Sequence, residues 1–96
     1  MPHPQPTNDQ LLAITEFLRA VAHPIRIQVI LLLDERGACS VKDIHEELDI
    51  QQPVASHHLR ILKDKGVVNS QRAGQSTMYQ LAKSEIAELV RLSLSI

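Results

Sequence analysis

The chain has 96 residues, enough for one small domain whose single core buries only a modest apolar area. Hydrophobic residues make up 44% of it, charged residues 22%, and the net charge is −1, which is an ordinary globular composition. Tyr79 and Phe17 are the only aromatic residues, so we expect an aliphatic core. The single cysteine, Cys39, excludes an intrachain disulfide and an all-cysteine zinc site, and favours a reducing compartment, the cytoplasm.

The N-terminal stretch MPHPQP holds three prolines and has neither a basic nor an apolar segment, so it does not resemble a signal peptide. We expect a disordered tail over residues 1–7 and one domain over residues 8–96. The longest strongly apolar stretch, from Val29 to Leu33, is far too short to span a bilayer, so no membrane partner is predicted.

The small net charge conceals an uneven distribution along the chain. Residues 34–50 carry six acidic side chains against two basic ones, a net charge of −4. Residues 51–75 carry Arg60, Lys63, Lys65 and Arg72 against Asp64, a net charge of +3. A basic segment in a neutral chain is a candidate contact for a polyanion, although four cations also fit an ordinary solvated surface.

The first two predicted helices are separated by a proline. Apolar residues recur at helical spacing between Asn8 and Val21, with Thr7 or Asn8 as the N-cap. Pro24 suits the first turn of a second helix, which continues through an apolar run until Gly37. Because the second helix is apolar on most faces, we expect it to lie centrally.

Two further helices follow with a tight connection between them. Ser40 and Asp43 have the spacing of a capping box, which predicts a short third helix over residues 41–48. Pro53 fits the first turn of a fourth helix that ends before Gly66. Two helices joined by about three residues are typical of a helix-turn-helix, here over residues 41–64.

After Gly66 the pattern changes to the alternation of strands. Two short strands around Gly74 predict a hairpin over residues 67–81, with Thr77, Tyr79 and Leu81 on one face of the second strand. Ser84 is the expected cap of a last helix over residues 84–94. The predicted fold is mainly α with a small β-hairpin: a dimeric winged helix-turn-helix of about five helices and a two-stranded wing.

The fourth helix contains two adjacent histidines, His57 and His58. Neighbouring positions on a helix point about 100° apart, so the two rings have different surroundings. One arc of the helix is predicted to face the core and comprises Val54, Ala55, His58, Leu59, Ile61 and Leu62. His57 falls on the opposite, polar arc. We expect His58 to form a hydrogen bond within the domain rather than to bind metal, because no ligand residue lies three or four positions away.

The polar arc offers side chains that suit the major groove of double-stranded DNA. Glutamine can pair with adenine, arginine with guanine, and serine with a base or a phosphate. Arg72, beside the turn at Gly74, is placed to contact a phosphate from the hairpin. The candidate DNA-binding residues are Gln51, Gln52, Ser56, His57, Arg60, Lys63, Arg72 and Gln75. An ordinary solvated helix face is the alternative.

Three segments resemble the ArsR (SmtB/ArsR) winged-helix repressors of bacteria: AVAHPIRIQVILLL, VKDIHEELDIQQPVASHHLRILKDKGVV and RAGQSTMYQL. The resemblance covers about residues 11–92. Its most specific part is the family's signature of a serine, one variable residue, then His-Leu, here Ser56 to Leu59. By this match His58 is the family's usual histidine, and His57 occupies the variable position that faces DNA.

The resemblance implies a homodimer formed by the first and last helices, with two recognition helices in successive major grooves of a pseudo-palindromic operator. Both terminal helices carry apolar stripes, which a monomer of this size would cover poorly. These stripes could also cover only the monomer core. The predicted dimer interface consists of Leu11, Ile14, Leu18, Leu89 and Leu92.

Many members of this family sense metals, and this chain departs from both of their known site types. Ser40 and Lys42 stand where arsenic and cadmium sensors have a Cys-x-Cys motif, and residues 82–96 contain Glu85 and Glu88 but no histidine. The sequence therefore predicts no metal and no cofactor, and leaves any small-molecule or redox effector unknown. Cys39 is expected to be a small buried residue.

The sequence predicts a DNA-binding transcriptional regulator, acting as a homodimeric repressor, and not an enzyme. A catalytic function is disfavoured because the chain has no glycine-rich phosphate loop and no cluster of ionisable residues. Two alternatives stay open. One is a winged-helix module that binds protein, which the acidic third helix would suit; the other is a thiol-responsive regulator acting through Cys39, which would need a disulfide between subunits.

Overall fold

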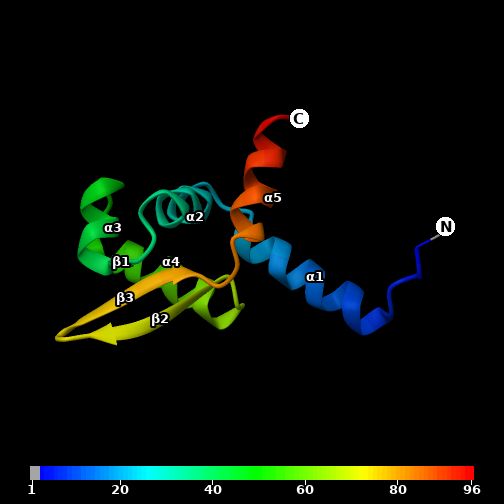
Figure 1. Cartoon of the computed structure of the whole chain (residues 1–96), viewed down its shortest axis with the longest axis horizontal. Coiled ribbons are helices and arrows are strands. Elements are labelled where there is room, and N and C mark those ends of the chain that lie inside the picture. Colours follow the sequence, from blue (N-terminus) through cyan, green and yellow to red (C-terminus); the bar gives the residue numbers. More distant parts are fainter. Residues whose placement is uncertain (1–2) are drawn as a thin grey trace.

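The computed structural model describes residues 3–96 and contains five helices and three short strands within them (Figure 1). In chain order they are α1 (Asn8–Val21), α2 (Pro24–Arg36), β1 (Cys39–Ser40), α3 (Val41–Glu47), α4 (Gln52–Asp64), β2 (Val68–Ala73), β3 (Ser76–Leu81) and α5 (Glu85–Leu94). The predicted disordered tail, residues 1–7, falls partly outside the described residues. Its described part, residues 3–7, is exposed and belongs to no helix or strand.

Local signals begin and end the first two helices where the sequence predicts. Thr7, rather than Asn8, caps α1: its hydroxyl accepts a hydrogen bond from the Gln10 backbone, and the Gln10 side chain accepts one from the Thr7 backbone. Pro24 begins α2, and Gly37 ends it. Gly37 has a φ of +82°, a backbone conformation that residues other than glycine rarely adopt. These caps fix both ends of the central helix.

A helix-turn-helix is formed by α3 and α4. The predicted capping box is present, because Ser40 Oγ accepts from the Asp43 backbone and Asp43 Oδ2 accepts from the Ser40 backbone, both at 3.1 Å. The turn passes through Asp49, whose φ of +53° reverses the chain within four residues. The two helices and the turn between them run from Val41 to Asp64.

The wing has one strand more than the sequence predicts. β2 and β3 form the expected hairpin, with Val68 opposite Leu81 and Ala73 opposite Ser76. β1, only two residues long, adds to the other edge of β3 and gives an antiparallel sheet of order β1-β3-β2. The expectation of a two-stranded wing was thus incomplete, because β1 has too few residues to show an alternating pattern.

The last helix begins at Glu85 with Ser84 at the N-cap position, as predicted, but the Ser84 side chain makes no capping hydrogen bond. Ser84 has helical backbone angles, φ −63° and ψ −28°, and its hydroxyl donates to Glu85 Oε1 at 3.1 Å instead of accepting from the helix backbone. A cap residue normally has extended backbone angles that turn its oxygen toward the following N–H groups. At Ser84 the backbone is already helical, and the hydroxyl makes no hydrogen bond to these N–H groups.

The core is aliphatic, as the composition predicts. α2 supplies Val29, Ile30 and Leu33, which are almost completely buried, and β3, α4 and α5 pack against this helix. α1 extends away from these elements for much of its length, so the molecule measures 49 × 27 × 20 Å (Figure 1). Among residues 3–96, no helix is long and apolar enough to cross a bilayer.

Candidate nucleic-acid interface

The inward face of α4 fixes the helix against the rest of the domain. Ala55, Leu59 and Leu62 are fully buried, as the helical wheel predicts. Two residues at the edge of the predicted core arc differ: Val54 is 37% exposed, and Ile61 is only half-buried. The buried stripe is therefore narrower than predicted, and the side of α4 open to a partner is correspondingly wider.

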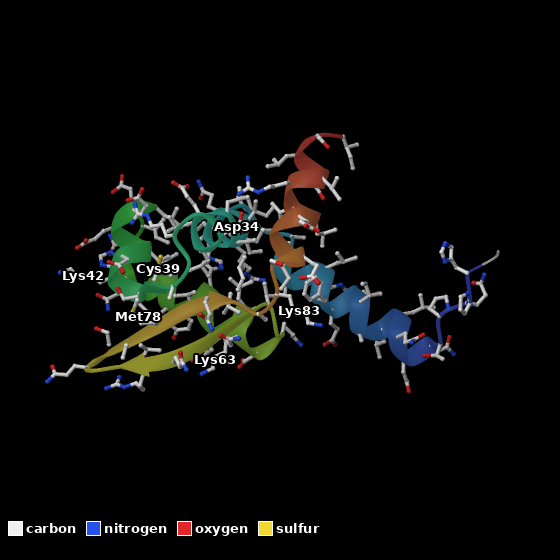
Figure 2. All side chains as sticks on the ribbon, viewed as in Figure 1. Asp34, Cys39, Lys42, Lys63, Met78 and Lys83 are labelled. Atoms are coloured by element: carbon white, nitrogen blue, oxygen red, sulfur yellow. The ribbon has the colours of Figure 1, made fainter. Side chains whose placement is uncertain are left out.

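The outward face of α4 carries the predicted polar side chains, and all of them are exposed: Gln52, Ser56, His57, Arg60 and Lys63. In the described part of the chain, neither Arg60 nor Lys63 pairs with a carboxylate. Their charges are thus not neutralised within the domain. Figure 2 labels Lys63 among the side chains that project from the ribbon.

The turn before α4 holds Gln51 at the N-cap position, exposed and with its side chain not engaged in capping. Within residues 3–96 the Gln51 amide makes no capping hydrogen bond, so it is available to an external partner. His45 stabilises this turn, because its Nδ1 lies 3.3 Å from the carbonyl oxygen of Ile50. The ring of His45 is half-buried, so it is part of the turn rather than of the solvated face of α3.

The hairpin places the two remaining candidates at its exposed tip. Arg72 lies opposite Thr77 in the β2–β3 ladder, and its Nη1 donates to Thr77 Oγ1 at 3.4 Å, a long hydrogen bond. Gln75 follows Gly74 in the turn, where the φ of Gly74 is +64°. β2 packs against α4, so the hairpin lies beside this helix (Figure 1).

The other histidine of the pair behaves as predicted. His58 is 6% exposed, and its Nδ1 accepts a hydrogen bond from Arg26 Nε at 3.1 Å. Burial, followed by the nearby His23, Arg26 and His57, lowers the pKa of His58. Arg26 was missed in the sequence, since a lone arginine among the apolar residues of α2 gives no signal for a partner 32 residues later.

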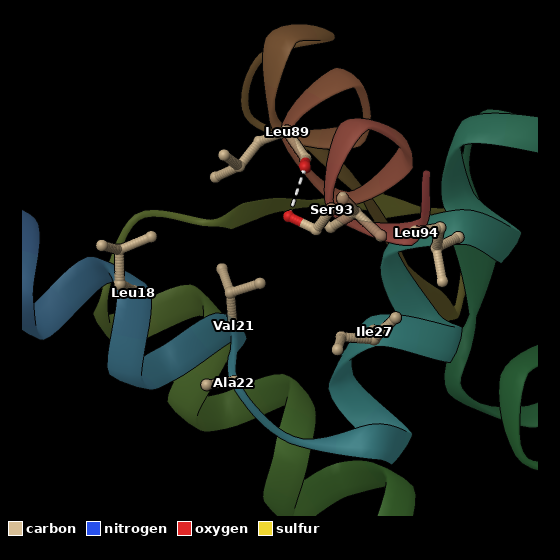
Figure 3. A pocket seen from close by; sticks show the side chains of 8 residues that line it. Leu18, Val21, Ala22, Ile27, Leu89, Ser93 and Leu94 are labelled. Atoms are coloured by element: carbon tan, nitrogen blue, oxygen red, sulfur yellow. Dashed lines mark hydrogen bonds between the residues drawn. The ribbon is translucent and has the colours of Figure 1, made fainter. Parts of the chain in front are cut away.

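A separate apolar surface runs over α1 and α5. The five predicted dimer residues are exposed, with Leu11 at 48% and Leu92 at 67%. Between the two helices and the start of α2 lies an open apolar hollow, lined by Leu18, Val21, Ile27 and Leu89 among others (Figure 3). Ser93 stands at its edge with its hydroxyl bonded to the Leu89 carbonyl at 2.9 Å, so the hollow offers few free polar groups.

Cys39 is a buried residue, as expected, and is 1% exposed where β1 meets α3 (Figure 2). Burial, and then the neighbouring Asp43, raises the pKa of its thiol, which disfavours the reactive thiolate. Among residues 3–96, no three histidine, cysteine or acidic side chains lie close enough to hold a metal ion.

The comparison with known families decides the classification. Residues 23–70, from the start of α2 through α4 into β2, match the family model described as bacterial regulatory protein, arsR family. The chain belongs to the ArsR family. The family resemblance noted in the sequence is therefore confirmed, and the matched segment contains the whole helix-turn-helix of this ArsR-family chain.

Individual relatives extend the match beyond that segment. The chain is 42% identical over 85 residues to the HTH-type transcriptional repressor SmtB of Mycobacterium tuberculosis, covering 88% of this chain but only 62% of the relative. A homodimeric winged helix-turn-helix DNA-binding domain from Mycobacterium bovis superposes with a TM-score of 0.81 at 27% identity, covering 99% of this chain and 88% of that one. The transcriptional repressor BigR from Xylella fastidiosa gives 0.79 at 26% identity, covering 91% and 88%. These structures confirm the winged helix-turn-helix fold of this ArsR-family chain.

Proposed function

We propose that this chain is a sequence-specific transcriptional regulator that binds double-stranded DNA as a homodimeric repressor, and not an enzyme. One observation carries the proposal: the outward face of α4 presents exposed amide, hydroxyl and cationic groups beside an exposed hairpin. This arrangement suits a major groove for the helix and a flanking phosphate for the wing. A protein that acts on chromosomal DNA in this way would work in the cytoplasm.

The candidate residues divide into two roles by their position. Gln51, Gln52, Ser56 and His57 are at the N-terminal end of α4, the end that approaches bases in a helix-turn-helix. Arg60 can reach either a base or a phosphate. Phosphate contacts are assigned to Lys63, further along α4, and to Arg72 and Gln75 of the hairpin.

The apolar residues of α1 and α5 support the proposed homodimer. Leu11, Ile14, Leu18, Leu89 and Leu92 are all exposed, and contact with a second copy would remove them from water. A twofold dimer presents two copies of α4, so the operator is pseudo-palindromic with half-sites about 34 Å apart. In this proposal the binding domain spans residues 8–96 and residues 1–7 form a tail.

We further propose that DNA binding needs no metal. At the start of α3, where other members of the family have their thiolate ligands, this chain has Ser40 and Lys42. The Ser40 hydroxyl is used in the capping box. A lysine does not replace a thiolate as a ligand. The chain spans 62% of the SmtB repressor that it matches, so any effector that it responds to is left open.

The proposal is tested by fluorescence anisotropy with a labelled duplex from the DNA upstream of the chain's own gene. Binding is measured at two salt concentrations, with EDTA, and against a scrambled duplex of equal length. A preference for the native duplex that survives EDTA supports a metal-independent regulator. Equal, weak binding to both duplexes contradicts the proposal and favours a module that binds protein, to which the acidic α3 could contribute.

A further inference from the structure

One guanidinium group joins three helices at the point where α4 meets the rest of the domain. Arg26, in the first turn of α2, donates from Nε to Nδ1 of His58 on α4 at 3.1 Å. Its Nη1 donates to the backbone carbonyl of Ala20, near the end of α1, at 3.2 Å. The hydrogen bond between Arg26 and His58 joins α2 to α4, and protonation of His58 at Nδ1 would break it.

The ring of His58 is also packed between two other histidines. His23 caps α2, since its Nδ1 accepts from the Ile25 backbone at 3.1 Å, and its ring centroid lies 4.5 Å from that of His58 with a tilt of 46°. The ring of His57 meets His58 edge-on at 5.3 Å. His58 is therefore held on one side by α2 and its cap, and on the other by its own neighbour in α4.

This geometry requires neutral His58. Because Nδ1 accepts a hydrogen bond, the ring carries its proton on Nε2. Protonation of Nδ1 would remove the acceptor and bring a second cation against the guanidinium of Arg26. Glu16, Arg19 and Lys65 line a second, polar pocket together with Arg26. Glu16 forms an ion pair with Lys65 at 2.9 Å, and Arg19 adds positive charge to this pocket.

We propose that Arg26 and His58 form a positioning pair that sets the rotation of α4, and that protonation of His58 releases α4 and weakens DNA binding. The proposal rests on the proposed DNA-binding function. Since His57 and His58 are adjacent, about 100° apart around the helix, fixing His58 inward fixes the direction of His57 and of the polar face beside it. Protonation of the buried His58 ring would thus change the orientation of the side chains that are proposed to contact bases.

The first test uses the free protein, with ¹⁵N NMR of the imidazole rings. We expect His58 to be the Nε2–H tautomer and to titrate below the ordinary value of about 6.5. In Arg26→Met, His58 should titrate closer to that value, because the neighbouring cation and donor are gone; Arg26→Lys, which keeps the charge, should shift it less. A wild-type His58 that titrates normally and ignores both substitutions would overturn the pair.

The second test measures DNA affinity between pH 8 and pH 5.5 with the native upstream duplex, in a His57→Gln background that leaves His58 as the only histidine of the pair. We expect affinity to fall about tenfold as pH decreases, the equivalent of one charge-assisted hydrogen bond. His58→Asn keeps an acceptor at the position of Nδ1 without titrating, so its affinity should stay constant. His58→Leu should bind weakly at every pH.

The outcomes separate this inference from the function on which it rests. If the wild type prefers the native duplex at pH 8 but His58→Asn and the His57→Gln background lose affinity in parallel as pH decreases, the switch is wrong and the DNA-binding function stands. If the wild type shows no preference at pH 8, the proposed function fails together with the effect on DNA. The NMR titration then decides the Arg26–His58 pair by itself.

Discussion

At the scale of single residues, Arg60 is the candidate whose loss should change sequence preference. It is exposed on the outer face of α4 and carries no ion pair among residues 3–96. If it pairs with guanine, Arg60→Ala should weaken binding to the native duplex by about 1–3 kcal/mol while leaving binding to a scrambled duplex nearly unchanged. Anisotropy titrations on both duplexes measure the difference. The matched control is Lys63→Ala, one turn away, which should weaken both by similar factors. If Arg60→Ala weakened binding to both duplexes equally, Arg60 would be assigned a contact with a phosphate instead of a base.

Asp49 is a second residue whose backbone conformation has a measurable consequence. Its φ of +53° lies in the left-handed region, which costs most side chains about 1–2 kcal/mol. Asp49→Gly should therefore raise the free energy of unfolding, by up to about 1 kcal/mol, and Asp49→Val should lower it. Urea denaturation checks both. Glu46→Gly, at an exposed helical position of α3, is the control and should be destabilising. A destabilised Asp49→Gly would show that the Asp side chain itself stabilises the turn.

At the scale of elements, the capping box determines whether the short helix α3 can support α4. Seven residues are too few for a helix to be stable by itself, so its ends matter more than in a longer helix. Ser40→Ala removes the acceptor for the Asp43 backbone and should lower the free energy of unfolding by about 1 kcal/mol. Ser84→Ala, whose hydroxyl makes no cap, should change it little. Thermal unfolding of the two variants compares them, and equal effects would contradict the assignment.

The capping box of α3 also makes a contribution to the free energy of unfolding that depends on pH. The hydrogen bonds from Ser40, first from its backbone N–H, lower the pKa of the Asp43 carboxyl below its ordinary value of about 3.9. A carboxylate whose pKa is lower in the folded state stabilises the fold above the unfolded value, and this contribution is lost as pH decreases through the lowered one. Asp43→Asn should therefore show a smaller loss of stability between about pH 5 and pH 2 than the wild type. Urea midpoints across that range measure it; parallel curves would argue against it.

The elements also show what the sequence could predict. Helix bounds were predicted well because their signals are local: Pro24 and Gly37 act within one turn of themselves. β1 was missed because its two residues are defined only by pairing with Tyr79 and Met78, about forty residues later. Ser84 was assigned as a cap from residue type alone, whereas capping needs extended backbone angles that a sequence does not reveal.

For the candidate site, residue type and helical period were sufficient to place the polar face of α4, and all eight proposed DNA-binding residues are exposed. The inward orientation of His58 followed from the same period, and its hydrogen bond within the domain was expected. Its partner, Arg26, was not, because the contact depends on how α2 crosses α4. Val54 lies at the edge of the arc, where the direction of neighbouring helices decides burial.

At the scale of the whole molecule, the elongated shape and the exposed leucines have one explanation. α1 projects from the domain, so its apolar residues contact few others of the same chain (Figure 1). α5 carries further exposed leucines, Leu89 and Leu92, beside the apolar hollow. Arg91 of α5 donates to Asp34 of α2 at 2.7 Å and so joins the two helices. With a net charge of only −1, long-range attraction to DNA is weak. Binding by two copies of α4 from one dimer would compensate for that weakness, because the second contact becomes intramolecular.

Separating the subunits should therefore cost more DNA affinity than any single contact residue does. Leu11→Glu with Ile14→Glu places two charges on the exposed stripe of α1, where a second copy would have to bury them unpaired. We expect sedimentation velocity to show a monomer, and affinity for the native duplex to fall by about a hundredfold, at the low end of the gain from bivalency. Ala13→Glu is the control, since about 200° around the helix from Leu11 it lies away from the stripe. A double variant that still sediments as a dimer would place the subunit contact elsewhere, and an affinity that survives in the monomer would mean that one recognition helix is sufficient.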